Sequence, residues 1–307
     1  MMGEWRVWQW FSAERSFPGS STAVLCKSFS QKEKGPLRRW LFRRKSPGDE
    51  SDRSVPVSVY WWRGVPNLGD SVSRVLVAGL SGRPVEPAEK RDRGKLIACG
   101  STIHRARRGD RVWGTGTLHE EQIPASRAIE ICAVRGPETA KILRNAGFEC
   151  PDVFGDPALL LPEVCPRERP RAPRYRVGVV PHYQDKGRLS IEDPAVAILD
   201  IQGSLDAYLD LLLECERIVS SSLHGVIFAE AYGISAQELR LGDDVRGAAH
   251  KFTDYYRGTG RERPEPLKES NWSRERPWQP PRIDPELRRS FPVTPLPDRR
   301  LVSDTTS

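Results

Sequence analysis

Residues 55–260 alternate short β-rich runs with glycine-rich turns and helical patterns. Such alternation is typical of α/β units, in which parallel strands are connected through helices. In the first half, buried strands are expected at 57–62, 96–98, 112–113 and 129–134. After the last of these, Pro137 and Gly147 are placed to begin and end a helix. The pattern therefore predicts a parallel α/β domain over residues 55–161.

A second region of the same kind follows residues 162–173, whose prolines and arginines are typical of an interdomain linker. Strands are expected here at 175–180, 195–201 and 217–220. Ser204 is placed to cap a helix, and a further helix is expected from near His224 or Gly225 to Tyr232. We therefore predict a second α/β domain over residues 174–260. Two such domains imply a cleft between the carboxyl ends of their sheets, where ligands bind in these folds.

The two flanks of the chain lack this pattern. Residues 1–54 alternate aromatic, small and basic patches, and we expect most of this extension to be poorly ordered. Residues 261–307 contain nine prolines, so this tail is expected to be either loose or laid over the body of the protein.

The formal net charge of +7 suggests nucleic acid as a partner, but the excess lies outside the α/β region. Residues 1–54 hold 11 Lys and Arg against six Asp and Glu, whereas residues 55–260 hold 27 of each. A folded domain that grips a polyphosphate backbone needs a surplus of cations, so no nucleic acid is expected. Within the basic extension, Leu37, Trp40 and Leu41 have helical spacing, as in a membrane-surface helix. A basic flexible tail is the alternative.

Other patterns bear on location and cofactors. No apolar run approaches the roughly 18 residues of a spanning helix, and Arg6 and Gln9 interrupt the segment that a secretory signal requires. The six cysteines form no CxxC pair, which favours a reduced, cytoplasmic protein. No P-loop, GxGxxG motif or metal-ligand spacing occurs, so we expect neither a metal nor a nucleotide cofactor.

Four polar residues near the expected cleft are the main candidates for a site. Asp70 precedes a helix and is expected to point into the cleft, unless it is only an N-cap. Arg135 lies before a helix start and suits a carboxylate or phosphate, with a surface arginine as the alternative. His224 lies beside a glycine at another strand-to-helix junction, and otherwise is a structural histidine. Lys251, flanked by aromatic residues, suits a phosphate or else lies on the surface.

These residues belong to an ordered set of motifs. The set comprises Asn67-Leu68-Gly69-Asp70, Gly100-Ser101, Trp113-Gly114-Thr115-Gly116, Val134-Arg135-Gly136-Pro137-Glu138-Thr139, Gly155-Asp156-Pro157-Ala158, Val180-Pro181-His182-Tyr183, Ser221-Ser222-Leu223-His224-Gly225 and Lys251-Phe252. In type and order it resembles the polysaccharide pyruvyl transferases, most of all the bacterial exopolysaccharide branch that includes the succinoglycan ketal-forming enzymes. The resemblance covers about residues 57–257.

The resemblance implies a GT-B-like pair of Rossmann-type domains that face a central cleft. It also implies transfer of pyruvate from phosphoenolpyruvate, as donor substrate, to a sugar of a lipid-linked or nucleotide-linked glycan precursor, as a ketal. By motif, His224 and Asp70 are then catalytic, and Arg135, Lys251 and His224 bind phosphoenolpyruvate. Further residues are expected at the cleft or near the acceptor, namely Asn67, His182, Ser221, Ser222 and Tyr255. The arginines Arg105, Arg107, Arg108 and Arg111 depart from the family pattern on the presumed acceptor side.

The family also suggests a partner for the basic extension. Glycan precursors in such pathways are commonly lipid-linked at the cytoplasmic face of the membrane, so residues 32–45 are expected to contact anionic lipids there. Two other functions stay open from the sequence. One is a GT-B glycosyltransferase that uses a nucleotide sugar, and the other is a binding protein without catalysis.

Overall fold

The computed structural model describes residues 55–188, 190–242 and 247–292. The membrane-binding segment expected at 32–45 and the last 15 residues of the tail lie outside the described residues. No helix in the described ranges is both long and apolar enough to cross a membrane.

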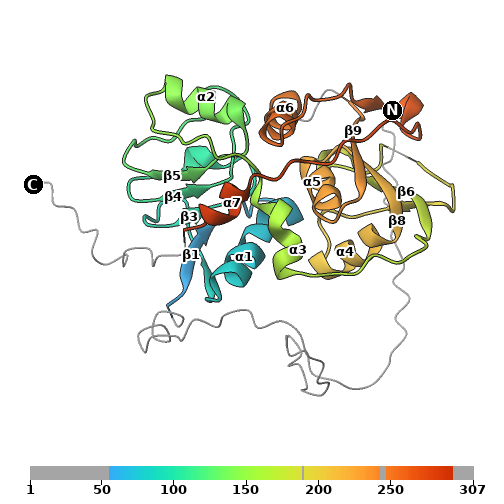
Figure 1. Ribbon diagram of the computed structural model, residues 1–307, viewed down its shortest axis with the longest axis horizontal. Helices are drawn as coiled ribbons and strands as arrows, with labels where there is room; N and C mark the ends of the chain where they lie inside the picture. The colour runs from blue at the N-terminus through green and yellow to red at the C-terminus, as the bar shows by residue number, and fades with distance from the viewer. Residues whose placement is uncertain (1–54, 189, 243–246, 293–307) are drawn as a thin grey trace, which may run out of the picture. The chain divides into compact units, whose positions relative to one another are not determined.

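The first lobe is built on a parallel sheet of five strands (Figure 1). The strands are β1 (Val57–Tyr60), β2 (Val85–Pro87), β3 (Leu96–Ile97), β4 (Arg111–Trp113) and β5 (Glu130–Ala133). The helices of this lobe are α1 (Leu68–Ser81), η2 (Ile103–Arg105), α2 (Pro137–Asn145), η3 (Pro157–Leu160) and α3 (Leu161–Val164). The predicted α/β sheet of the first half is therefore confirmed, with β2 as an added edge strand.

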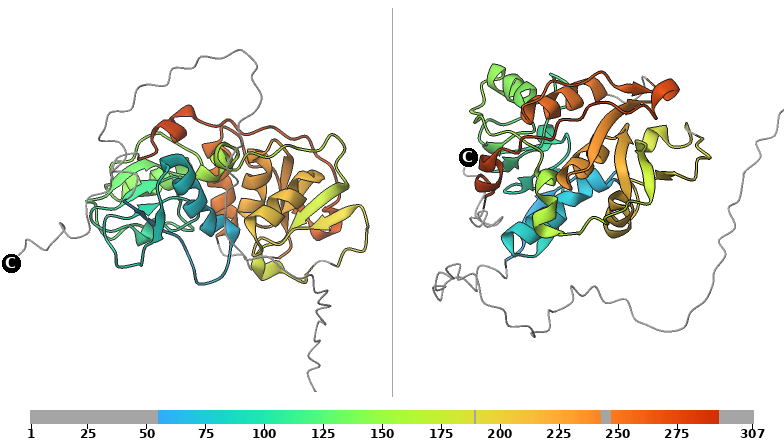
Figure 2. Two further views of the ribbon diagram at one scale, coloured as in Figure 1. Left: turned by 90° about the horizontal axis from the view of Figure 1, so that it is seen from below. Right: turned by 45° about the vertical axis from the view of Figure 1, so that its right-hand side comes forward.

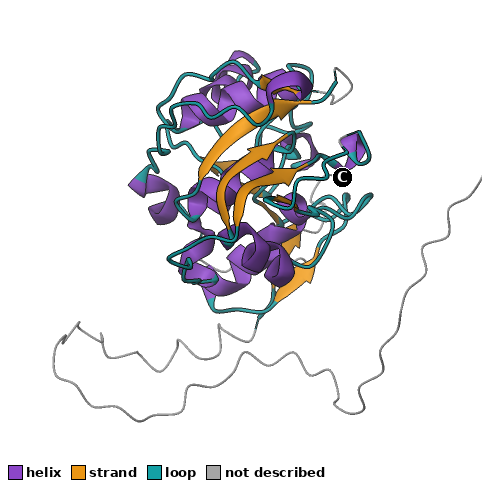
Figure 3. Cartoon of the chain, turned by 90° about the vertical axis from the view of Figure 1, so that its right-hand side faces the viewer, coloured by secondary structure: helices purple, strands orange, loops and turns teal. Residues whose placement is uncertain are grey.

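The second lobe repeats the plan with its own parallel sheet of five strands (Figure 3). Its strands are β6 (Tyr175–Val180), β7 (Val196–Ile198), β8 (Cys215–Ser220), β9 (Ser235–Arg240) and β10 (Leu267–Lys268). Its helices and short turns are η4 (Tyr183–Asp185), α4 (Leu205–Leu213), α5 (Leu223–Ala231), α6 (Ala248–Gly258) and η5 (Glu269–Asn271), and α7 (Pro285–Arg289) follows in the tail.

Both sheets have the same strand order. It runs β2-β1-β3-β4-β5 in the first sheet and, read from the opposite edge, β7-β6-β8-β9-β10 in the second. In such doubly wound folds a ligand binds outside the carboxyl ends of the strands, where the order reverses. The reversal points here lie between β1 and β3 and between β6 and β8, so the loops that follow these four strands are the places to seek a site.

Local sequence explains why the helices next to these points begin where they do. The Asn67 side chain accepts a hydrogen bond of 2.8 Å from the Gly69 N–H and so caps α1. The Ser204 side chain caps α4 in the same way, as predicted, by accepting from the Ala207 N–H. Helix α5 follows Ser222 and is buried almost all round, which suits its nearly continuous apolar sequence.

The described part of the tail, residues 261–292, is laid over the body (Figures 1 and 2). It first adds β10 to the edge of the second sheet and then reaches the first lobe through α7. There the Trp113 indole N–H donates to the Leu287 carbonyl at 2.8 Å, and the Phe291 ring packs edge-on against Trp113 with ring centroids 4.8 Å apart. The tail was expected to be either loose or laid over the body, and the described part is laid over the body.

Candidate active site

A pocket of about 340 Å³ opens where the loops after the four central strands meet. It is lined by Trp62, Asn67, Asp70, Gly100, Ser101, Thr102, His104, Arg105, Leu118, Gln122, Arg135, His182, Tyr183, Ser222, Leu223, His224 and Lys251. Both lobes contribute, and all four principal candidates from the sequence lie in this lining. A neighbouring cavity of about 490 Å³ is larger, but it contains none of the four.

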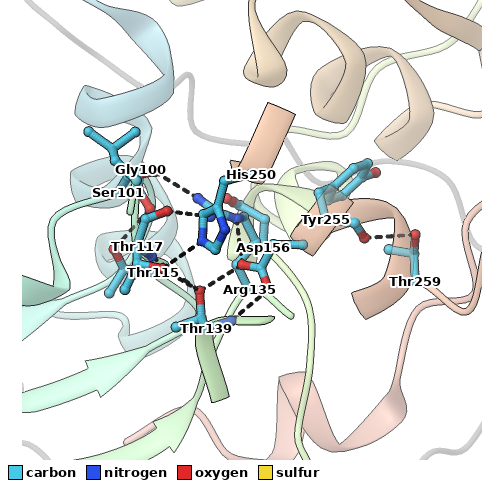
Figure 4. Close-up of polar contacts among 12 residues, drawn as sticks. Gly100, Ser101, Thr115, Thr117, Arg135, Thr139, Asp156, His250, Tyr255 and Thr259 are labelled. Atoms are coloured by element: carbon cyan, nitrogen blue, oxygen red, sulfur yellow. Dashed lines mark hydrogen bonds and ion pairs between the residues drawn. The ribbon is translucent and has the colours of Figure 1, made fainter. Parts of the chain in front are cut away.

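Arg135 is fully buried and held on three sides (Figure 4). Its Nε lies 3.0 Å from the Asp254 carboxylate, and its two terminal nitrogens donate to the Ser101 hydroxyl at 2.7 Å and to the Thr117 carbonyl at 2.8 Å. Asp254 also accepts two hydrogen bonds from Thr139 at the start of α2. The alternative of a surface arginine is therefore wrong. A guanidinium has five N–H donors, so two remain for a ligand in the pocket.

Asp70 lies in the first turn of α1, but it is not the cap, because Asn67 has that role. Burial raises its pKa to about 6, against the lowering effect of nearby His224 and Lys251. Gly100 makes room for the carboxylate, since a Cβ there would lie 2.6 Å from Oδ1. Gly100 also has a φ of +92°, which few other residues adopt. Asp70 is thus a carboxylate poised to exchange a proton near neutral pH.

His224 faces a second carboxylate that sequence reasoning had given no role. Its Nε2 lies 3.5 Å from Oδ2 of Asp156, and neither buried atom has a hydrogen-bond partner among the residues that the structure describes. The other oxygen of Asp156 accepts from the Ala158 N–H at the start of η3, which fixes the carboxylate. On its opposite side the imidazole packs on Gly69, where a Cβ would lie 2.2 Å from Nδ1. Asp156 and Gly69 together therefore fix the orientation of the ring.

Lys251, on α6, is buried to 9% exposure. In the described part of the chain its ammonium has neither a hydrogen-bond partner nor a carboxylate within ion-pair distance. Burial and the charge of Arg135 lower its pKa to about 8, while Asp70 acts in the opposite direction. At neutral pH the pocket thus contains a largely protonated ammonium that no carboxylate of the described residues pairs with directly.

The remaining sequence candidates divide between several places. Ser222 and Asn67 line the pocket, as does His182, whose pKa burial and Lys251 lower to about 4. Ser221 instead lines the neighbouring cavity and accepts a hydrogen bond from the His182 N–H. Tyr255 is fully buried outside both cavities. Its hydroxyl donates to Glu230 at 2.5 Å, and the structure therefore places it in the core rather than at the pocket.

Two residues of this arrangement escaped the sequence reasoning. Asp156 stands in the motif Gly155-Asp156-Pro157-Ala158, and an aspartate before a proline, as at the start of a helical turn, is the signal that could have identified it. Asp254 follows Lys251 by less than one helical turn, but its pairing with Arg135 joins positions 119 residues apart. No local pattern reveals such a pairing.

Comparison with known proteins agrees with the resemblance seen in the motifs. The family described as polysaccharide pyruvyl transferase matches residues 87–236, which include Arg135, Asp156, His182 and His224. Asp70 and Lys251 lie just outside the match. The exopolysaccharide branch is not distinguished by it.

A protein of Acanthamoeba polyphaga mimivirus, described only as uncharacterized, is 34% identical over 173 residues. The aligned region is 53% of this chain and 60% of that relative, so the chain spans less than two thirds of the relative's length. Over residues 87–236, which contain most of the pocket, this chain is therefore similar to the polysaccharide pyruvyl transferases.

Proposed function

We propose that this protein transfers pyruvate from phosphoenolpyruvate to two hydroxyls of a sugar in a glycan precursor, forming a ketal and releasing phosphate. The observation that carries the proposal is one pocket that brings together Lys251, which has no ion pair in the described residues, Arg135, Asp70 and the pair formed by His224 and Asp156. Anion binders and proton-transfer groups are what this reaction requires.

The donor fits the charge of the pocket. Phosphoenolpyruvate carries a carboxylate and a phosphate, and the Lys251 ammonium offers a point charge to either of them. Arg135 adds its two uncommitted N–H donors from a guanidinium that Asp254 and Ser101 keep in place. Because Arg135 is fixed before a ligand arrives, little ordering entropy of this side chain is lost when the anion binds.

The chemistry assigns proton transfers to His224 and Asp70. His224 protonates the methylene carbon of the donor through Nδ1, since Nε2 faces Asp156, and the carbon beside the carboxylate becomes electrophilic. A sugar hydroxyl adds there while Asp70 accepts its proton. The second hydroxyl then closes the ring as the carbon–oxygen bond to phosphate breaks. Its proton returns to His224, and the proton held by Asp70 leaves on the phosphate. The products are a methyl-bearing ketal and inorganic phosphate, so every atom of the donor is accounted for.

Three further parts of the proposal concern the setting of the reaction. The two lobes are proposed to face each other as in GT-B enzymes. The acceptor is proposed to be a lipid-linked or nucleotide-linked precursor of a bacterial cell-envelope exopolysaccharide, modified in the cytoplasm. Residues 32–45, which are rich in Lys and Arg, are proposed to hold the enzyme at anionic lipids on the inner face of the membrane.

The test is to incubate the protein with labelled phosphoenolpyruvate and lipid-linked or nucleotide-linked sugars, and to follow both the label and phosphate. Label in an acid-labile sugar product with equal phosphate release is expected. His224→Ala is expected to bind the donor but not transfer, while His119→Asn, a histidine outside this pocket, is expected to be active. Release of a nucleoside diphosphate from a nucleotide sugar, with no transfer of label, would instead support a glycosyltransferase.

A further inference from the structure

The pocket contains a second cation without a partner. Arg105 lines it from the 3₁₀ turn η2, and its Nε is buried without a hydrogen-bond partner. In the described part of the chain the Arg105 side chain makes neither a hydrogen bond nor an ion pair. A partly buried cation without a counter-charge is costly, which is a reason to expect an anion from outside the protein.

None of the three neighbouring arginines lines the pocket, and two of them have partners in the protein. Arg107 donates to the Lys90 carbonyl, and Arg111 pairs with Glu130 at 2.7 Å. Arg107 and Arg108 are exposed, and Arg108 does not line the pocket. Of the four arginines that depart from the family pattern, only Arg105 therefore faces the pocket.

His104, the residue before Arg105, also brings a hydrogen-bonding group to the pocket. Its Nδ1 is buried without a hydrogen-bond partner within residues 55–188, 190–242 and 247–292, and the ring lines the same pocket. Burial, Arg105 and His119 lower its pKa to about 4, so the ring is neutral at pH 7 and offers an N–H donor without a charge. A cation and a neutral donor on one turn match the oxygens of a single phosphate.

The turn that presents these two side chains is fixed by the fold. The Arg105 N–H donates to the Thr102 carbonyl at 2.9 Å, and the Thr102 N–H donates to the Thr115 hydroxyl at 3.1 Å. Ile103 between them is fully buried in the core of the first lobe. The two side chains thus start from a rigid backbone, as a preformed binding site requires.

We propose that His104 and Arg105 form a phosphate subsite in addition to Lys251 and Arg135. The inference rests on the proposed function, because both sources of the phosphate are its proposed substrates. The phosphate belongs either to phosphoenolpyruvate or to the diphosphate of the glycan precursor. The chemistry recognised is the same in both cases, the anionic oxygens of a phosphate group held by a guanidinium fork and an imidazole N–H.

Binding measurements test the subsite without any turnover. Titration calorimetry of the full-length protein with inorganic phosphate and with phosphoenolpyruvate is compared for wild type, Arg105→Gln and Arg108→Gln. Both variants remove one positive charge from the same segment, but only Arg105 faces the pocket. Arg105→Gln is expected to weaken phosphate binding by about 10-fold or more, as for the loss of a charge-assisted hydrogen bond. Arg108→Gln is expected to leave it unchanged.

The outcomes separate the two sources of the phosphate. Weaker binding of phosphoenolpyruvate by Arg105→Gln assigns the subsite to the donor. Unchanged donor binding, with weaker binding of a nucleoside diphosphate sugar, assigns it to the acceptor. Arg105→Lys, which keeps the charge, is expected to recover part of the affinity, and a matching melting temperature excludes misfolding.

The proposal is overturned if Arg105→Gln binds all three probes as wild type does, or if wild type binds none. Failure of the transfer reaction with phosphate binding intact would refute the proposed function and leave the subsite standing.

Discussion

Burial moves the pKa values of Asp70 and Lys251 toward each other and toward neutrality. The pKa of the carboxylate rises to about 6 and that of the ammonium falls to about 8. Each shift has desolvation as its largest cause, because a buried site disfavours the charged form of either group. Between these two values Asp70 is ionised and able to accept a proton, while Lys251 is protonated and able to bind an anion.

A bell-shaped dependence of kcat/KM on pH follows from these two groups. The rate is expected to rise as Asp70 loses its proton through about pH 6 and to fall as Lys251 loses its own through about pH 8. Lys251→Arg is expected to move only the alkaline limb upward, since a guanidinium stays protonated. Steady-state rates from pH 5 to 10 check this, and a Lys251→Arg profile identical to wild type would contradict the assignment.

Asp156 is expected to position His224 rather than to touch the substrate. Asp156→Asn keeps an oxygen to cap η3, but its amide group would donate to Nε2 and so change the tautomer of the ring. We expect kcat to fall about 100-fold or more, by analogy with triad carboxylates, with donor affinity and melting temperature nearly unchanged. Asp152→Asn at the surface is the matched control. Equal loss of donor affinity and kcat would instead indicate a role in binding.

At the scale of elements, α1 carries Asp70 in the lining of the pocket, and its first turn contacts the ring of His224. Gly69 in its first turn contacts the imidazole, and Gly79 near its end contacts Val164 of α3. Both glycines allow a close approach that a Cβ would prevent, although alanine is otherwise the better helix former by about 1 kcal/mol. One helix therefore offers two substitutions of the same kind, one at the site and one remote from it.

Gly69→Ala and Gly79→Ala are expected to separate activity from stability. At Gly69 a Cβ would lie 2.2 Å from Nδ1 of His224 and would displace the ring, so kcat is expected to fall strongly. At Gly79 it would lie 2.5 Å from a Val164 methyl, which costs about 1–3 kcal/mol of stability as overpacking does. Activity at low temperature and urea unfolding check the pair. Equal activity of the two variants would refute the close approach at Gly69.

Elements with continuous apolar runs could be predicted from the sequence. The strand at 175–180 and the helix that Ser204 caps were predicted as the structure has them. Strand β9 was missed because it contains Gln237 and Glu238, which are buried beside the tail, where Arg263 pairs with Glu238 and the Arg276 carbonyl accepts from the Gln237 amide. The site was predictable to the same degree. Its residues at strand ends could be identified from local motifs, whereas pairs distant in the sequence, such as Arg135 with Asp254, could not.

For the molecule as a whole, the tail connects the second sheet to the first lobe (Figure 2). Arg261 forms a buried ion pair with Glu230 at 2.7 Å, and Trp278 donates to the same carboxylate. Farther along, Leu287 is fully buried against Gly155, the residue before Asp156. The tail thus supports from outside the loop that positions His224.

Leu287→Ala is expected to cost about 2–5 kcal/mol of unfolding free energy, because it leaves a cavity beside Gly155. Arg289→Ala on the same short helix is the control, since its side chain is 72% exposed and pairs only with Glu286 in the described residues. Urea unfolding checks both variants. A Leu287→Ala midpoint like that of wild type would show that the tail does not support the body.

The same contact has a consequence during protein synthesis. Trp113 is fully buried, yet its cover comes from Leu287 and Phe291, which the ribosome adds more than 170 residues later. Until that stretch emerges, the nascent first lobe exposes a large indole to water, where chaperones bind and wrong contacts form. The first lobe is therefore synthesised early, but the packing around Trp113 can form only after the tail has left the ribosome.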